Sequence, residues 1–484
     1  MTNEEGARGP SLLPSTWSDV DATGWQKRGR WAAPQHYMCS YMAMFPPELP
    51  HYFIERFTVP GDRVLDPFSG RGTTAVEAAA QGRHGIGNDL NPLAVALTRG
   101  KLSNPSMKEV IARLDELERG YDPSKWKTKG QPDRILMLYH ENTMRQMVYL
   151  KATLDWSKPG VDAFIVAVLM GAMHGASNGF LSLPMPNTFS MGWGYISRKI
   201  KEEPEKFACP DRDAFEVLRH RVKRQLGKGS LVGTGETIYG DVRDLAKKVE
   251  HDSIQLLFTS PPYLKVIKYG LYNWIRLWFL TESGGHEEVD EVLDDTHALE
   301  AYLQFMTETM AACLPTLDRR RGLSCWAIGD VKELNLALEI WERAARHIRI
   351  QLEDGTELRY RLLAIVEDEI PPEEKVTKLW KTTEFVVRSV DDAGETVEEF
   401  MRTRKEKEAK EFLTELTADM SDADAASIDI MSVRLDLSGK ATPIDRILMM
   451  CPHVAKPQSM VEHDDVTWDA LRVQGRSIQA TLDV

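Results

Sequence analysis

The short stretch "FTSPPY" in the middle of the chain combines residue types that could take part in chemistry. Ser260 directly follows an apolar run that predicts a short buried strand. Pro261 and Pro262 can neither continue a helix nor donate to a sheet, because they lack an amide hydrogen. A hydroxyl, a carbonyl without a competing amide and the ring of Tyr263 are therefore expected together at a stiff strand end.

A second stretch, "DPFSGRGTTA", is rich in glycine. Gly70, Gly72 and Ala75 have the spacing of a dinucleotide fingerprint, and Asp89 ends the next predicted strand. Glycines let the backbone pass close to a ligand, and an acidic residue at this place accepts hydrogen bonds from ribose hydroxyls. A Walker loop is excluded because no Gly-Lys-Ser/Thr follows at the required spacing. The pattern indicates an adenosine cofactor, with a tight turn that binds nothing as the alternative.

The residues around the glycine stretch predict the architecture that holds it. Residues 61–92 give a strand, the glycine loop, an alanine-rich helix and a second strand, which is the start of a doubly wound parallel sheet. A helix begun by prolines is predicted over 46–59. Residues 93–230 are mostly helical in pattern, with an irregular loop predicted at 181–200.

The second half of the chain alternates predicted strands and helices. Strands are predicted at 237–245, 253–258, 323–331, 360–366 and the end of 439–450. Helices are predicted at 270–280, 302–317 and, strongly charged, at about 395–416, with a loop at 371–384. Trp274 and Trp278 lie four residues apart on an apolar helix and are predicted to be core residues.

Composition limits the class of protein. With 484 residues, 42% of them hydrophobic and 27% charged, the chain fits a soluble globular protein with a large core. No stretch approaches the roughly 20 apolar residues of a membrane span, and the acidic N-terminus does not resemble a signal peptide. Five scattered cysteines without a C-x-x-C pair favour a reducing compartment, so we expect a cytoplasmic protein.

Charge and metal-ligating residues give weaker signals. A net charge of −13 argues against nonspecific coating of nucleic acid, but it allows a local basic groove. The basic stretches 197–229 and 319–321 are candidates for such a groove, with a solvated face or an exposed helix end as the alternative. Cys451, His453 and His463 lack a fourth ligand at a usual spacing, so no metal is expected.

Four motifs together carry a family resemblance. "VLDPFSGRGTT", "GIGNDLNP", "GDVRDL" and "TSPPY" resemble the amino-group DNA methyltransferases that use S-adenosylmethionine, and the resemblance runs from about Tyr41 to Met450. "YMAMFPPELPHYFIERF" is similar to the family segment that closes over the methionine end of the cofactor. "SLPMPNTFSMGWGYI" and "GKATPIDRILMM" are similar to stretches of cytosine-N4 members. The resemblance implies an α/β fold: a Rossmann-like methyltransferase sheet with helices on both faces, plus a helical insertion and a C-terminal insert.

The resemblance also assigns cofactor contacts. Asp66 and the loop after it would hold the methionine portion, Asp89 the ribose hydroxyls and Asp241 the adenine amino group. Ionised carboxylates only accept hydrogen bonds, which suits these donors. Asp66 could instead be a turn residue, and Asp241 a helix cap. The implied cofactor-binding residues are Phe45, Asp66, Pro67, Phe68, Ser69, Gly70, Gly72, Thr73, Thr74, Asp89, Leu90 and Asp241.

The proline motif is then expected to be catalytic, through Ser260, Pro261, Pro262 and Tyr263. An exocyclic base amine is a poor nucleophile, because its lone pair is delocalised into the ring. The Ser260 side chain and the Pro261 carbonyl could accept its two hydrogens, while Tyr263 stacks on a base flipped out of the duplex. No covalent intermediate and no metal are needed. In the family, Ser at the first position usually accompanies cytosine N4, whereas Asp or Asn accompanies adenine N6.

The predicted organisation has four parts. Residues 1–30 form a flexible arm, 31–100 and 231–380 with 439–455 the methyltransferase core, 101–230 a helical insertion, and 384–438 a charged helical insert. The insertion is the candidate target-recognition region, because its loop 185–199 combines aromatic and basic residues. The insert near 384–439 is the alternative. The candidate DNA contacts are Lys265, Lys268, Arg198 and Lys199. The expected partners are double-stranded DNA and a cognate restriction endonuclease, and the sequence leaves the oligomeric state open.

Three other functions compete with this prediction. An RNA base methyltransferase would share the cofactor loop and the proline motif, but it predicts an RNA-binding module that the sequence does not show. A nicotinamide-dependent oxidoreductase would explain Gly70, Gly72 and Asp89, but it leaves Ser260 and Tyr263 without a role. A catalytically silent DNA-binding relative is disfavoured, because every expected polar group is present.

Overall fold

The structure is a computed structural model that describes most of the chain in two compact units. The described residues are 33–41, 45–177, 179–185, 190–227, 229–262, 269–282, 285, 287, 289, 299–329, 334–369, 383–390, 396–403, 406–418, 428–434, 444–455, 468–473 and 476–481. One unit holds the large sheet and most helices, and the other comprises residues 370–443 with 331–333. The predicted arm 1–30 and the residues Tyr263, Lys265 and Lys268 lie outside the described residues.

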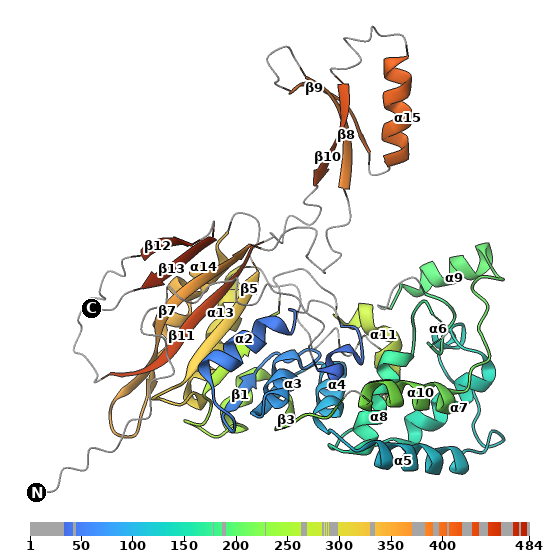
Figure 1. The fold of residues 1–484 in the computed structure, drawn as a ribbon, viewed down its shortest axis with the longest axis horizontal. Coiled ribbons are helices and arrows are strands. Elements are labelled where there is room, and N and C mark those ends of the chain that lie inside the picture. Colours follow the sequence, from blue (N-terminus) through green and yellow to red (C-terminus); the bar gives the residue numbers. More distant parts are fainter. Residues whose placement is uncertain are drawn as a thin grey trace, which may run out of the picture. The chain divides into compact units, whose positions relative to one another are not determined.

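The large unit is built on one mixed sheet (Figure 1). Five parallel strands run in the order β3-β2-β1-β4-β5, which is the doubly wound order. Strands β11, β7, β13 and β12 continue the sheet beyond β5 in antiparallel pairs. The bounds are β1 Arg63–Asp66, β2 His84–Asp89, β3 Thr234–Tyr239, β4 Leu256–Thr259, β5 Leu323–Gly329, β6 Ile350–Gln351, β7 Glu357–Glu369, β11 Ile444–Ala455, β12 Trp468–Val473 and β13 Arg476–Thr481.

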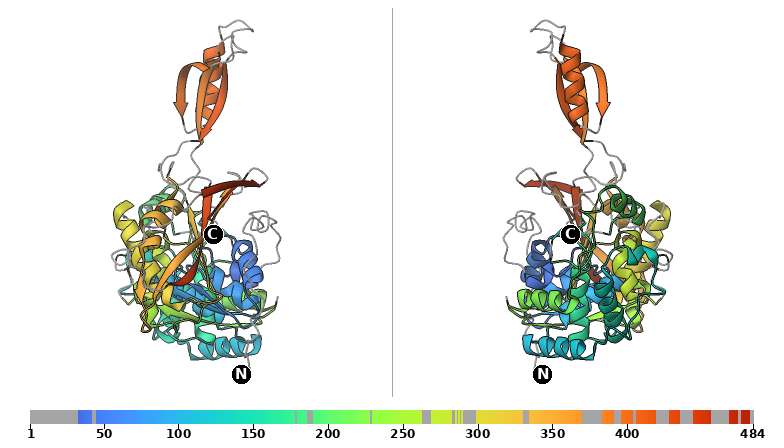
Figure 2. Two further views of the ribbon diagram at one scale, coloured as in Figure 1. Left: turned by 90° about the vertical axis from the view of Figure 1, so that its left-hand side faces the viewer. Right: turned by 90° about the vertical axis from the view of Figure 1, so that its right-hand side faces the viewer.

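Helices cover both faces of this sheet, which confirms the predicted Rossmann-like α/β class (Figure 2). Every residue of β4 and β5 is buried, as expected for parallel strands covered on two sides. Helix α2 packs Phe53 and Phe57 into the same apolar cluster as Phe258 of β4. The covering helices are α2 Glu48–Phe57, α3 Thr73–Ala80, α4 Pro92–Leu102, α13 Leu299–Cys313 and α14 Leu336–Arg343.

A second group of helices follows α4 in the chain. These are α5 Met107–Gly120, α6 Asp133–Leu136, α7 Glu141–Thr153, α8 Val161–Ala172, α9 Trp193–Glu202 and α10 Ala214–Leu226, joined later by α11 Tyr269–Leu280. From Ala163 onward α8 is buried all round, so it forms the centre of this group. Trp274 and Trp278 of α11 are each 1% exposed, which confirms that they are core residues.

One local prediction in this region is wrong. Residues 193–200 of the predicted irregular loop 181–200 belong to helix α9, which spans Trp193–Glu202. Only Ile196 of this helix is buried. Lys199 pairs with Glu202 and Glu203 at helical spacing, and these partners lie beyond the stretch that looked like a loop.

The small unit also differs from the prediction, which placed one charged helix at about 395–416. It contains an antiparallel sheet in the order β10-β8-β9, with β8 Thr383–Val390, β9 Thr396–Thr403 and β10 Ile428–Arg434. The helix α15 spans only Glu406–Thr417. Pairing of β9 with β8 decides the conformation of the first half, because sheet context overrides helix propensity.

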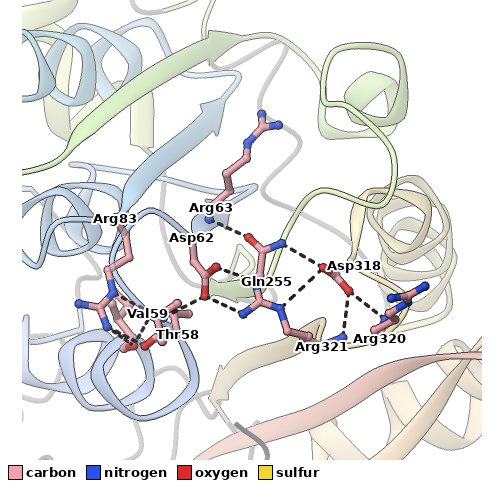
Figure 3. Close-up of polar contacts among 10 residues, drawn as sticks. Thr58, Val59, Asp62, Arg63, Arg83, Gln255, Asp318, Arg320 and Arg321 are labelled. Atoms are coloured by element: carbon pink, nitrogen blue, oxygen red, sulfur yellow. Dashed lines mark hydrogen bonds and ion pairs between the residues drawn. The ribbon is translucent and has the colours of Figure 1, made fainter. Parts of the chain in front are cut away.

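The amino ends of β1, β4 and β5 are fastened by a polar network (Figure 3). Arg321 donates to Asp62 at 2.6 Å, and Asp62 also accepts from the Val59 amide at 2.9 Å. Gln255 joins the network by accepting from the Arg63 amide at 2.9 Å and donating to Asp318 at 3.2 Å.

The basic stretch 319–321 is part of this network. It forms the turn before β5 and not a helix end, because the amides of Arg320 and Arg321 donate to Asp318 at 2.9 and 3.0 Å.

We expect Arg321→Ala to lower the free energy of unfolding by about 1–2 kcal/mol, because it leaves the buried Asp62 carboxylate with one donor fewer. Arg320→Ala is the matched control. Among the described residues, Arg320 forms its hydrogen bond in this turn through its backbone amide, which the substitution keeps, so the free energy of unfolding should change by no more than about 0.5 kcal/mol. Urea unfolding measures both values, and equal effects would contradict the role of the Arg321 side chain.

Candidate active site

Four polar strand ends meet at one edge of the sheet. Asp66 ends β1, Asp89 ends β2, Tyr239 ends β3 and Thr259 ends β4. These strands are parallel neighbours, so their carboxyl ends lie at the same edge. The strand order reverses between β1 and β4, which is where ligands bind in open α/β sheets.

Asp66 is buried where the two predicted motifs meet. Its Oδ1 accepts from Thr259 Oγ1 at 2.6 Å and from the Phe68 amide at 3.2 Å. Burial raises the pKa of Asp66 to about 7, although these hydrogen bonds favour the charged form. Its Oδ2 and the nearby Thr74 Oγ1 are both buried without a hydrogen-bond partner among the described residues. Asp66 therefore has acceptor capacity left for a ligand.

The glycine loop requires its glycines. Gly70 and Gly72 have positive φ values of 50° and 80°, and a Cβ on Gly72 would lie 2.6 Å from Thr98 Oγ1. The Ser69 amide donates to the Asn88 carbonyl at 2.9 Å, which fixes the loop against β2. Helix α3 begins at Thr73, directly after the loop. Of the predicted residues, Pro67 to Gly72 thus form the turn between β1 and α3, and Thr73 and Thr74 begin the helix.

Asp89 lies against this loop. Its carboxylate accepts from the Gly70 amide at 2.8 Å and from the Asn91 amide at 2.8 Å. Burial of the carboxyl raises the pKa of Asp89 to about 6, although the hydrogen bonds from backbone amides lower it. A carboxylate has about four acceptor positions, so two of them remain for the hydroxyl pair of a ribose.

Asp241 has a structural role in the described chain. It caps the short helix η3 (Val242–Lys247) by accepting from the Arg243 amide at 2.9 Å. The Arg243 guanidinium also bonds to it, which lowers the pKa of Asp241. The cap anticipated as one alternative is therefore present, and the contact with adenine stays a prediction.

The proline motif presents one unsatisfied group. Ser260 Oγ is buried and has no hydrogen-bond partner among the residues that the structure describes. Pro261 is buried and Pro262 is half-buried. Ser260 follows Thr259, whose hydroxyl donates to Asp66, so the predicted catalytic motif and the predicted cofactor motif are joined directly.

The remaining predicted cofactor residues surround this edge. Phe45 packs edge-on against Phe258 with ring centroids 5.6 Å apart, and Phe68 packs against Phe305 at 5.8 Å. Leu90 lines a cavity of about 680 Å³. The other lining residues are Pro92, Trp156, Tyr239, Gly240, Leu280, Thr281, Glu282 and Val289. Trp156 comes from the connection between α7 and α8, and no local pattern could place it beside β3.

Two of the candidate DNA contacts lie on α9 and are engaged within the protein. Lys199 Nζ lies 3.0 Å from both Glu202 and Glu203, and Arg198 lies 3.8 Å from Glu202. Their contact with DNA stays a prediction. Tyr41 is a site residue that sequence reasoning missed: its hydroxyl accepts from Asn91 Nδ2 at 3.0 Å, beside Asp89. Its place at the start of the segment "YMAMFPP" was the available signal.

The described ranges contain neither a candidate metal site nor a candidate membrane-spanning helix. No group of three or more His, Cys, Asp and Glu side chains there could hold a metal ion. None of the described helices has the length and apolar character needed to cross a membrane.

Comparison with known proteins finds similar sequences. A sequence profile of the DNA methylase family, N6_N4_Mtase, matches residues 14–99. Type II methyltransferase M.BsoBI of Geobacillus stearothermophilus is 23% identical over 287 residues, or 51% of this chain and 52% of that protein. M.MvaI of Kocuria varians is 25% identical over 267 residues, or 50% and 56%. The chain thus spans about half the length of these curated relatives.

A solved structure, rRNA methyltransferase aviRa from Streptomyces viridochromogenes, is similar at 12% identity with a TM-score of 0.24 over 66% of this chain and 84% of that one. A similarity this low carries no argument. The profile and the Type II relatives support the predicted resemblance to the amino-group DNA methyltransferases.

The raised pKa of Asp66 makes stability depend on pH. The native carboxyl titrates near 7, whereas an unfolded one titrates near 3.9, so this group favours the native state most below pH 4. That contribution is lost as the pH rises towards 7. We expect Asp66→Asn to raise the free energy of unfolding at pH 8, by at most about 4 kcal/mol, and to leave it nearly unchanged at pH 4. Urea unfolding of the cofactor-free protein at both pH values measures this, and an equal difference at both would contradict it.

Proposed function

We propose that the protein is a DNA methyltransferase that moves a methyl group from S-adenosylmethionine to the exocyclic amine of a flipped base, cytosine N4 in particular. The hydrogen bond from Thr259 Oγ1 to Asp66 carries this proposal, because it joins the "TSPPY" strand end to the glycine loop. The match to the DNA methylase profile and the Type II relatives support the class of reaction.

The carboxylates favour a cationic cofactor. Asp66 and Asp89 lie on adjacent strand ends, and the protein raises the pKa of each. A ligand that brings positive charge and donors would stabilise both ionised forms, as clustered perturbed groups at a site suggest. S-adenosylmethionine has a sulfonium, an ammonium and two ribose hydroxyls. A nicotinamide dinucleotide would instead place an anionic pyrophosphate at the glycine loop beside Asp66, which disfavours the oxidoreductase alternative.

The residues that would hold the cofactor follow from these contacts. Asp66 and the glycine loop would bind the methionine portion, Asp89 the ribose and Asp241 the adenine amine. When bound, S-adenosylmethionine supplies an electrophilic methyl group. The protein's own contribution is then to place a nucleophile in line with that methyl, which is mainly positioning and electrostatics.

Ser260 and Pro261 would prepare the nucleophile. Ser260 Oγ is buried without a partner among the described residues, so it could accept one hydrogen of the base amine, and the Pro261 carbonyl would accept the other. Drawing both hydrogens away from the ring plane localises the nitrogen lone pair. The fixed φ angles of Pro261 and Pro262 hold these acceptors without further ordering. Tyr263 would stack on the base, which must leave the duplex to reach the site.

The choice of base and of partner belongs to the same proposal. Serine at position 260 supports cytosine N4, with adenine N6 as the alternative. Double-stranded DNA is the proposed substrate, and the helical region 101–230 is the proposed target-recognition region. A cognate restriction endonuclease is the proposed partner, because the relatives are Type II methyltransferases.

The decisive experiment is methyl transfer from tritiated S-adenosylmethionine to duplex DNA or to RNA, followed by digestion to nucleosides. The proposal expects label in DNA as N4-methylcytosine. Label in N6-methyladenine would correct the base, label only in RNA would refute the DNA substrate, and absence of transfer with intact cofactor binding would refute the activity.

Ser260→Ala tests the role of the free hydroxyl. We expect turnover to fall about 10²–10³-fold, because one acceptor of the reacting amine is lost, with cofactor affinity nearly unchanged. Asp89→Ala is the complementary variant and should mainly weaken cofactor binding, because it removes the ribose acceptor. Single-turnover rates and calorimetric Kd values separate the two effects. A Ser260→Ala enzyme with a near-normal rate would exclude the proposed acceptor.

A further inference from the structure

The segment Pro34–Tyr41, before the predicted cofactor motifs, is built into the site. It begins with the short helix η2 (Pro34–Tyr37). Arg71, the residue between the two loop glycines, donates to the His36 carbonyl at 3.0 Å. On its other side the segment meets α8, where a Cβ on Gly171 would lie 1.8 Å from the Met38 carbonyl oxygen. The backbone of the segment is therefore held between the glycine loop and the helical region.

A buried polar cluster, His36–Glu77–His51, fixes this segment further. Glu77, on the helix that follows the glycine loop, is 2% exposed, and His36 is fully buried. Glu77 Oε2 lies 2.9 Å from His36 Nε2, and Glu77 Oε1 lies 2.7 Å from His51 Nδ1 on α2. Both carboxylate oxygens thus bind an imidazole, so that three separate parts of the chain meet at one carboxylate.

The charge state of the cluster suits a fixed geometry. Burial lowers the pKa of His36 to about 4, so this ring is neutral at pH 7 and donates through Nε2 to the carboxylate. Burial alone would raise the pKa of Glu77, but the bonds from His36 and His51 lower it. Burying a carboxylate costs free energy that apolar packing would avoid. The hydrogen bonds of the cluster are directional, so they fix the orientation of the segment, which apolar contacts do not do.

Tyr41, at the end of this segment, contacts the glycine loop and the first residue of the helix that follows the proline motif in the chain. Its ring would lie 3.4 Å from a Cβ on Gly70, so it covers the glycine loop. Its hydroxyl accepts from Asn91 Nδ2 at 3.0 Å, two residues beyond Asp89. Its ring stacks on Tyr269 with centroids 6.1 Å apart, and Tyr269 is the first residue of α11, which follows the proline motif.

We propose that the His36–Glu77–His51 cluster is an anchor that positions Tyr41 as a brace between the cofactor loop and the catalytic motif. The inference rests on the proposed function for the identity of the ligand and the reaction. Tyr41 is a positioning residue: it orders Gly70 and Asn91 for the cofactor and Tyr269 for the proline motif. Glu77 acts through Tyr41 and touches neither the cofactor nor the base.

The brace is tested with two substitutions at one position. Tyr41→Phe keeps the ring that covers Gly70 and stacks on Tyr269, and it loses only the hydroxyl that accepts from Asn91. Tyr41→Leu loses the ring as well. We expect Tyr41→Leu to lower kcat at least about tenfold and to raise the Kd of S-adenosylmethionine about tenfold, and Tyr41→Phe to recover most of kcat. Equal kcat values in wild type and Tyr41→Leu would overturn the brace.

The anchor is tested by Glu77→Gln, which keeps the shape of the side chain. Hydrogen exchange should become faster over 34–41 and stay unchanged in α4, and the Kd of S-adenosylmethionine should rise about tenfold. Glu236→Gln is the matched control, because Glu236 also pairs with a histidine, His84 at 3.4 Å, but on the exposed side of β3. It should change neither quantity.

The outcomes separate this inference from the proposed function. A loosened segment with unchanged Kd and rate, or a weaker Kd with unchanged exchange, would overturn the anchor. A wild-type protein that binds no S-adenosylmethionine would refute the proposed function, and the exchange data would still test whether Glu77 holds the segment. If Glu77→Gln fails to fold, the two Tyr41 variants decide the matter through their kcat values.

Discussion

The hydrogen bond between Thr259 and Asp66 is the contact on which the rest of the site depends. It crosses from β4 to β1 at the point where the strand order reverses, and it ties the residue before Ser260 to the residue before the glycine loop. The Asp66 carboxyl is buried, with a pKa near 7 and one oxygen that has no partner among the described residues. It can therefore change between a neutral state that burial favours and an ionised state that suits the proposed cationic ligand. The contact with Thr259 fixes the geometry, and burial of Asp66 raises its pKa.

The amino ends of the strands help to fix the geometry of this contact. β1 and β4 have only four residues each, so any shift at one end appears at the other. Arg321, Asp62 and Gln255 fasten the amino ends of β1, β4 and β5, as Figure 3 shows. The network lies at the amino ends of the strands, whereas the glycine loop follows the carboxyl end of β1. Its role is to fix the positions of the three strands relative to one another. Stability at one edge and chemistry at the other are thus served by different residues.

Local patterns predicted the glycine loop, the strands that carry Asp66 and Asp89, and the burial of Trp274, because each depends on neighbours in the chain. They failed where a distant partner decides. β9 is a strand because β8 pairs with it, although its charge suggested a helix. The bond between His36 and Glu77 spans 41 residues, and the one between Thr259 and Asp66 spans 193. Sequence spacing identified the chemistry of these residues but could not show which of them meet.

Hydrophobic packing joins the helical region to the proposed cofactor site. Tyr41, Leu97 of α4, Phe164 of α8 and Trp274 of α11 belong to one hydrophobic cluster, so the insertion shares its core with the helix that follows Asp89. A close-packed core transmits small displacements, because it has few voids to absorb them. A ligand that shifts α8 would therefore press on Met38 through Gly171, and through that segment on Tyr41 and the glycine loop. Packing thus connects the proposed target-recognition region with the proposed cofactor site.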